Sequence, residues 1–421
     1  ALLTRSRSQY AALIIFSGMG LADFLFRTHI FPVYTYSLQK IGAKPIWTDL
    51  DVGFAPIVWL SFFAIILGSL TIVITFASQN VPKLIDLYMD HWQSLLFVWW
   101  SAACLIHALT IKVLAEVGAD IVPSLVFNYH VLLAVSLVIG FPFVFSILRS
   151  TKTSNVIENL LQGSYATFKH LTKKGPTGKI SHQEHEKLQY KLFEELNQLM
   201  DLLVYVPYKE PKAQIIEGIG ALLQNYVQSK SNFPEYFFKI DQRIYEDISF
   251  RTMKNLLGEV EKSHTFYEQK SFRLIGNVYN IFLETGEFDL STLCVEQLVQ
   301  IGKTAIECDD QELIEVVTVR LNTYFRFALK HGQHHNEPRN LYNLVFHYGQ
   351  FLGYLMEYKQ VDRTRTCIGY FVFYGQQCFN AISRAGSLAF ILDVLASEMQ
   401  KLMIKIQQKN WDRELQDELL Q

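Results

Sequence analysis

The chain contains 421 residues, with 38 Lys and Arg residues against 40 Asp and Glu residues, and half of all residues are hydrophobic. Residues 1–150 hold only eight of the basic and seven of the acidic residues, so most charges lie in the remaining 271 residues. This distribution predicts a membrane-embedded first third followed by a region of ordinary soluble composition. Neither part is basic enough to indicate nucleic-acid binding.

Cysteines and enzyme motifs are both sparse. The five cysteines include no CxxC pair, and their odd number favours reduced thiols in a cytoplasm over a disulfide framework. The chain has no P-loop, no Rossmann fingerprint, no HExxH motif and no nucleophile elbow. We therefore expect neither an enzymatic activity nor a bound cofactor.

The first predicted membrane span covers residues 10–26. Asp23 lies within it and Arg27 follows one turn later, a spacing at which opposite charges on a helix can pair. We expect Asp23 to be paired or interfacial, with a carboxylate on an ion pathway as the alternative. Residues 29–47 are rich in aromatic side chains, which predicts a connector at the level of the lipid headgroups.

The second predicted span, residues 54–81, carries a stripe of small and hydroxyl residues. They recur at spacings of three and four, so a helix places them on one face: Ser61, Ala64, Gly68, Thr71, Thr75 and Ser78. One interpretation is close packing against another helix. The other is a pore lining, with Gln79 and Asn80 at one mouth. Pro82 then acts as a hinge to an amphipathic segment that follows the span.

Two more apolar runs predict a third span at residues 94–111 and a fourth at residues 122–148. His107 lies in the third span, and we expect it to be hydrogen-bonded between helices, with titration or ion binding as the alternative. Gly140 and Pro142 predict a kink in the fourth span.

Basic residues predict the topology of a domain that comprises residues 1–150. Arg5 and Arg7 precede the first span, Lys83 follows the second, and Arg149 follows the last. Because Lys and Arg concentrate in cytoplasmic segments, we expect a multi-pass protein of the cell (inner) membrane with both termini in the cytoplasm.

The rest of the chain has helical periodicity and no strand pattern. Residues 151–180 predict a linker helix and loop, and Ser181 with Glu184 forms a capping box at the start of a cytoplasmic all-helical domain, residues 181–421. Later helices are predicted at residues 236–262, 265–285, 291–306, 310–330, 338–358, 363–383 and 387–409. Without a repeat of fixed period, this indicates a helical bundle or an α-solenoid.

Polar clusters in the cytoplasmic part have structural explanations. His331, His334 and His335 are the best candidates for metal ligands, but we interpret them as a polar loop and expect no metal site. His182 and His185 are expected to be solvated. Further clusters are interpreted as a helix cap, at Asp309 and Asp310, and as a solvated basic face, at Lys359, Arg363 and Arg365.

One stretch resembles a known family. The segment LTIVITFASQNVPKLIDLYMDHWQSLLFVW, within residues 60–115, is similar to part of a bacterial family of predicted membrane proteins, the domain of unknown function 2254. The shared features are a span rich in Ser, Thr and Val, a turn formed by Ser78, Gln79, Pro82 and Lys83, an amphipathic helix and another span. The cytoplasmic part departs from the usual tail of that family. The resemblance implies a multi-pass membrane protein and no particular mechanism.

These observations favour an all-α, homo-oligomeric ion channel or channel-like protein. The second span would line a central pore for permeating ions, and the helical domain would regulate it. The alternative is a membrane-anchored sensor or scaffold whose helical domain binds a protein and whose stripe packs against another span of the same protomer. A secondary transporter is disfavoured, because no internal repeat and few intramembrane charges are present.

Overall fold

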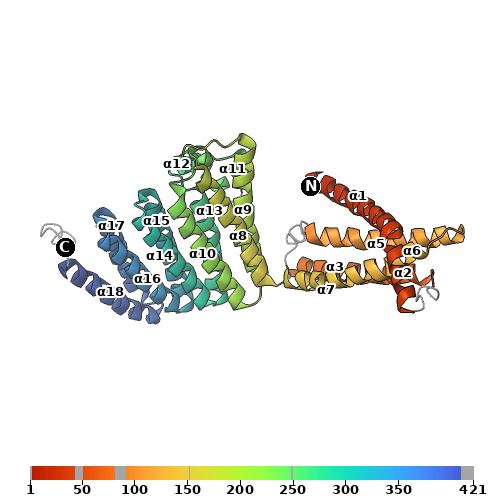
Figure 1. The fold of residues 1–421 in the computed structure, drawn as a ribbon. Helices are drawn as coiled ribbons and strands as arrows, with labels where there is room; N and C mark the ends of the chain where they lie inside the picture. The colour runs from red at the N-terminus through yellow and green to blue at the C-terminus, as the bar shows by residue number, and fades with distance from the viewer. Residues whose placement is uncertain (1, 43–50, 81–91, 151, 248–249, 409–421) are drawn as a thin grey trace. The chain divides into compact units, whose positions relative to one another are not determined.

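The computed structural model is all-helical in the part of the chain that it describes, with no β-strand there, which confirms the predicted all-α class. The described residues are 2–42, 51–80, 92–150, 152–247 and 250–408. The chain divides into two compact units, Ala1–Val156 and Ile157–Gln421 (Figure 1).

The first unit begins with one helical stretch from α1 (Leu2–Leu25) through a π-helical turn, η1 (Phe26–Ile30), to α2 (Phe31–Ile41). The connector expected at residues 29–47 was therefore wrong for its first part, because the helix continues to Ile41. Pro32 explains the wide turn: its ring cannot donate a hydrogen bond and would clash with a carbonyl of the preceding helical turn.

The remaining helices of the first unit are α3 (Phe54–Asn80), α5 (Trp92–Glu116), α6 (Val122–Val126), π-helical η3 (Phe127–Leu132) and α7 (Leu133–Ser150). Among the described residues, three helices are long and apolar enough to cross a membrane, namely Tyr10–Ile41, Leu96–Glu116 and Val122–Gly140. Within α3, residues Phe54–Ser69 form a shorter apolar stretch. Membrane association is thus supported by three helices, while four complete spans remain a prediction.

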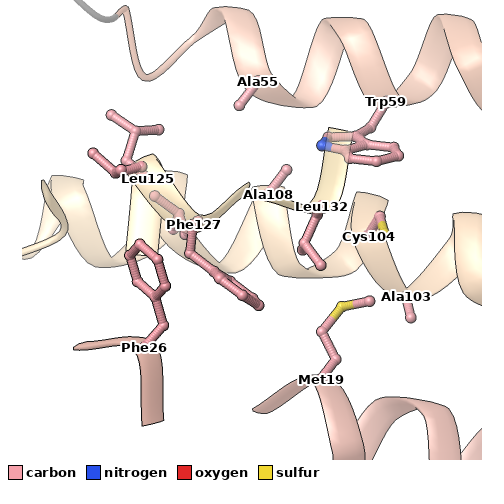
Figure 2. Close-up of a cluster of buried hydrophobic side chains, with 12 residues drawn as sticks. Met19, Phe26, Ala55, Trp59, Ala103, Cys104, Ala108, Leu125, Phe127 and Leu132 are labelled. Atoms are coloured by element: carbon pink, nitrogen blue, oxygen red, sulfur yellow. The ribbon is translucent and has the colours of Figure 1, made fainter. Parts of the chain in front are cut away.

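Helix α5 lies between α3 and α1, and all three contribute to the core of the first unit (Figure 2). The buried face of α5 includes three small side chains, Ala103, Cys104 and Ala108. Small residues let neighbouring helices approach closely, which is how membrane helices pack without a hydrophobic drive between them. Trp59 of α3 and Met19 of α1 pack over this face from the two sides.

The second unit is a succession of helices that follow one another in chain order (Figure 1). These are α8 (Thr153–Lys174), α9 (His182–Tyr205), α10 (Lys209–Lys230), α13 (Phe266–Thr285), α14 (Phe288–Glu307), α15 (Gln311–His335), α16 (Arg339–Glu357), α17 (Val361–Ala381) and α18 (Ala389–Gln408). Contacts run between α10, α14, α16 and α18, and separately between α13, α15 and α17. The helices therefore form two layers. From Ile157 onward, α8 belongs to this unit and buries its apolar face there.

The helix predicted at residues 236–262 was wrong, because the described part of this stretch forms four short helices instead. They are η4 (Glu235–Phe238), α11 (Gln242–Tyr245), η5 (Arg251–Leu256) and α12 (Leu257–Lys262). The side chain of Asp241 caps α11, and the ammonium of Lys270 binds Asp247 at 2.8 Å. These polar contacts favour local turns over one continuous helix. We call residues 231–262 the inserted segment.

Candidate functional site

The stripe on α3 is exposed wherever its side chains are described. These residues are Ser61, Ala64, Gly68, Thr71 and Thr75. A Cβ added to Gly68 would meet no atom within 4 Å, so none of the described helices packs closely against it. Ser78, Gln79 and Asn80 lie at the end of α3, where only the backbone is described, and Pro82 lies outside the described residues.

The opposite face of α3 forms its contacts within the protomer. Ala55, Trp59 and Ile66 are buried there, and Phe62 packs edge to face on Phe97 of α5. At 100° per residue this buried face lies nearly opposite the stripe. The stripe is therefore not the surface through which α3 contacts the other described helices of its own protomer.

Hydroxyl groups on the stripe donate to their own helix. Ser61 Oγ donates to the carbonyl of Ile57 at 2.9 Å, and Thr71 Oγ1 donates to that of Leu67 at 2.8 Å. These bonds satisfy the donors without a second helix, as is common for Ser and Thr in membrane helices. The exposed face therefore presents hydroxyl oxygens, which are neutral hydrogen-bond acceptors.

A chain of polar side chains crosses the interior of the first unit. Asp23 Oδ2 accepts from Ser124 Oγ at 2.8 Å and lies 3.5 Å from His107 Nε2. The other ring nitrogen of His107 is 3.0 Å from Asn128 Nδ2, and Trp59 Nε1 donates to Asn128 Oδ1 at 2.6 Å. This polar network joins α1, α6, α5, η3 and α3.

Sequence reasoning found only part of this network. The hydrogen bond between helices that was predicted for His107 is confirmed. The pairing considered between Asp23 and Arg27 was wrong, because Asp23 faces His107 and the guanidinium of Arg27 lies 3.7 Å from Asp120. Asn128 was missed, although an amide inside an apolar run is a signal for a polar contact between membrane helices.

Both π-helical turns lie next to the network. Asp23 precedes η1, Asn128 belongs to η3, and the rings of Phe26 and Phe127 from the two turns are 5.2 Å apart (Figure 2). Such turns occur mostly as single insertions in α-helices and are frequent at functional sites. Asp23 Oδ1 is buried without a hydrogen bond, so the network retains one acceptor for a further donor.

We expect Trp59→Phe to destabilise the first unit, because it leaves the buried amide oxygen of Asn128 without its donor. Asn128 is only 1 % exposed, so the loss is about 1–3 kcal/mol. The measurement is the midpoint of heat-induced aggregation in detergent. Trp100→Phe is the matched control: it removes the 2.8 Å bond from Trp100 Nε1 to Ser136 Oγ, but this oxygen, unlike the amide oxygen of Asn128, belongs to a hydroxyl that can still donate a hydrogen bond. Equal midpoints for the two variants would contradict the assignment.

The polar clusters considered in the second unit have nearby charges that limit their chemistry. The polar loop expected at His331, His334 and His335 was wrong, because these residues form the last turns of α15. The rings of His331 and His335 lie 4.5 Å apart in a pocket that is also lined by two cations, Arg326 and Lys330, and by Glu284. Arg363 forms an ion pair with Glu315, so part of the predicted basic face is compensated.

Comparisons with known proteins add no assignment: no family model, no curated protein and no solved structure matches this chain. The resemblance of residues 60–115 to the domain of unknown function 2254 therefore stays a prediction. Function has to be argued from the residues themselves.

Proposed function

We propose that this chain is a multi-pass membrane protein that forms a homo-oligomeric ion channel, with α3 lining the pore. The supporting observation is that the small, hydroxyl-bearing face of α3 is exposed while its opposite face holds the protomer together. A single stripe on a single helix encloses nothing. Several copies around an axis would bring their stripes together around water and permeating ions.

In this proposal α3 also crosses the membrane, in addition to the three helices that are long and apolar enough by themselves. Its 27 residues are about 40 Å long at 1.5 Å per residue, enough to cross the hydrocarbon core of a bilayer. Together with the three other apolar stretches, this gives four spans with both termini in the cytoplasm, in agreement with the basic residues of the sequence. The resemblance of residues 60–115 points to the same class of protein.

Within this proposal the polar network sets the orientation of α3. Trp59 is 1 % exposed and its indole is fixed by Asn128, which is held in turn by His107 of α5. Rotation of α3 about its axis would break the bond from Trp59. The network therefore fixes which face of α3 is directed away from α5, and so where the stripe points.

The second unit is proposed to be a cytoplasmic regulatory domain of the α-solenoid type. Its two layers of successive helices match the way in which solenoids stack one helix pair on the next. The same turn recurs between helices, with His264, Asp309 and Lys359 in the left-handed conformation at the same position. Equivalent hydrogen bonds surround each of them, which supports a structural repeat.

A scaffold is the second candidate, and exposed apolar side chains on α17 and α18 favour it. These are Val372, Phe373, Phe379 and Phe390, each more than half exposed. Clustered exposed apolar residues mark surfaces that bind other proteins. The scaffold reading in which the stripe packs within its own protomer is not supported, because the stripe is exposed.

Recordings from purified protein in planar bilayers, together with the mass of the detergent-solubilised particle, test the proposal. We expect discrete unitary currents and a mass of several chains. Neutral hydroxyl oxygens give a pore little charge selectivity, so both small cations and small anions should be tried. A monomer without currents would overturn the channel and leave the scaffold.

A further inference from the structure

The first turns of α9 are held against the inserted segment by one buried amide. Gln189 donates from Nε2 to the carbonyls of Phe237 at 2.7 Å and Lys239 at 2.8 Å. Its Oε1 accepts from the backbone N–H of Asp241 at 3.1 Å. These three bonds join one side chain of α9 to the backbone of residues 237–241. Asp241 is therefore held beside the start of α9.

Three metal-ligating side chains meet at this place. His182 and His185 are three residues apart on α9 and therefore share a face of the helix. One nitrogen of each and one oxygen of Asp241 lie within 4.8 Å of one another, in an open cleft of about 450 Å³. Asp241 Oδ1 accepts from the N–H of Arg243 at 3.0 Å as the cap of α11, which leaves Oδ2 for another contact.

The ring of His185 lies 4.9 Å from that of Tyr236, but it has no hydrogen bond within the described part of the chain. Its side chain is 2 % exposed and neither ring nitrogen makes a hydrogen bond, so the expectation that His185 is solvated was wrong. The backbone carbonyls of Lys239 and Phe237 lie beside this imidazole. A neutral imidazole is the form that binds metal ions, and carbonyls beside it are the usual acceptors for its second nitrogen.

We propose that His182, His185 and Asp241 form a binding site for a divalent transition-metal ion of the Zn²⁺ class. Two imidazole nitrogens and one carboxylate oxygen are a ligand set of catalytic zinc sites, in which the fourth position is left to water. Borderline nitrogen ligands favour such ions over Mg²⁺ and Ca²⁺, which prefer all-oxygen sites. A bound ion would tie the inserted segment to α9.

Neighbouring charges permit a cation here. Glu186, the residue after His185, forms an ion pair with Arg243 at 2.6 Å, so that guanidinium is compensated. The ammonium of Lys239 lies 5.6 Å over the ring of Tyr236 and is exposed to solvent. The positive end of α9 opposes a cation, but Ser181 accepts from the N–H of Glu184 in the first turn.

Zn²⁺ titration of the full-length, tag-free protein in detergent, after chelation and dialysis, tests the site. We expect one Zn²⁺ per chain, and Co²⁺ should give the visible absorption of a tetrahedral site. Asp241→Asn and His182→Gln should each weaken binding at least about 10-fold, since even outer-shell changes cost 10–100-fold. Both variants should fold, because asparagine is an equally good helix cap and His182 is exposed.

His334→Gln and His335→Gln are the matched controls, because they remove histidines from the other cluster of the same unit. They should leave the Zn²⁺ affinity unchanged. Hydrogen exchange of residues 235–246 should slow on Zn²⁺ addition in the original chain and not in Asp241→Asn. Absence of saturable binding, or equal affinity in Asp241→Asn and His182→Gln, would overturn the proposal. This test needs no ion current, so its outcome is separate from that of the channel.

Discussion

Thr71→Leu and Thr75→Leu should each abolish or sharply reduce unitary currents while the oligomer stays assembled. Both threonines lie on the exposed stripe, so we expect the fold of the protomer to tolerate a larger side chain there. In a pore, every subunit would add a bulky apolar group at the same level of the axis. A ring of such groups narrows the path and favours its dewetting.

Planar-bilayer recordings and the mass of the detergent-solubilised particle measure the two parts of this expectation. Ile65→Phe is the control on the same helix: Ile65 is 67 % exposed and lies about 90° around the helix from the stripe. It should leave the currents intact, as should Thr71→Ser, which keeps the hydroxyl. Unchanged conductance in both leucine variants would remove α3 from the pore.

Local signals in the sequence were enough to predict most of the helices and two of their caps. Ser181 accepts from the N–H of Glu184 as the capping box requires, and Asp310 accepts from the N–H of Leu313 at the start of α15. Apolar runs likewise marked three stretches that can cross a membrane. These features depend on residues a few positions apart, so periodicity and capping chemistry suffice to find them.

Contacts between distant residues could not be predicted in the same way. Asp23 and Ser124 are 101 residues apart, and Trp59 and Asn128 are 69 apart, so nothing local in the chain joins them. The burial of His185 could not be predicted from local sequence either. Its place at a capped helix start predicts a solvated ring, and only the packing of the inserted segment buries it.

The helical repeat escaped a search for a fixed period for a physical reason. The turns at His264, Asp309 and Lys359 share backbone hydrogen bonds, but their residues differ and their spacings are unequal. A left-handed residue at each turn is set by backbone geometry, which histidine, aspartate and lysine can all adopt at some cost. The repeated turn is therefore more evident in the backbone structure than in the residue types.

A buried ion cluster in the second unit carries the largest expected effect on stability. Lys230 of α10 binds Glu268 of α13 at 2.9 Å and also contacts Asp310, the cap of α15. Glu268 is fully buried, and its second oxygen has no hydrogen bond. One ammonium therefore compensates two carboxylates where three helices meet.

Lys230→Met should destabilise the second unit by about 3–5 kcal/mol, because it removes the cation and leaves buried carboxylates uncompensated. Hydrogen exchange of α10, α13 and α15 in the full-length protein measures the loss. Lys209→Met is the matched control: its pair with Asp289, at 3.4 Å, is exposed and contributes only about 0–1 kcal/mol. Similar exchange in the two variants would show that the cluster does not stabilise these helices.

The pH dependence of this loss identifies its cause. Burial raises the pKa of Glu268 and the ammonium of Lys230 opposes that shift, so removing Lys230 should raise the pKa further. In the variant, the folded state then binds a proton that the unfolded state releases. Stability must fall as pH rises from the ordinary pKa of 4.5 toward the raised value. Lys230→Met should therefore be closer to the original protein at pH 5 than at pH 8.

The double variant Lys230→Met with Glu268→Leu separates charge from packing. Replacing a buried ion pair by apolar side chains of similar size is often nearly neutral, whereas removing one charge is not. We therefore expect the double variant to recover part of the stability that Lys230→Met loses, since Asp310 still lacks its cation. It should also lose the pH dependence that Glu268 causes between pH 5 and pH 8. A double variant less stable than Lys230→Met would mean that Glu268 stabilises the three helices by its packing and not through its ion pair.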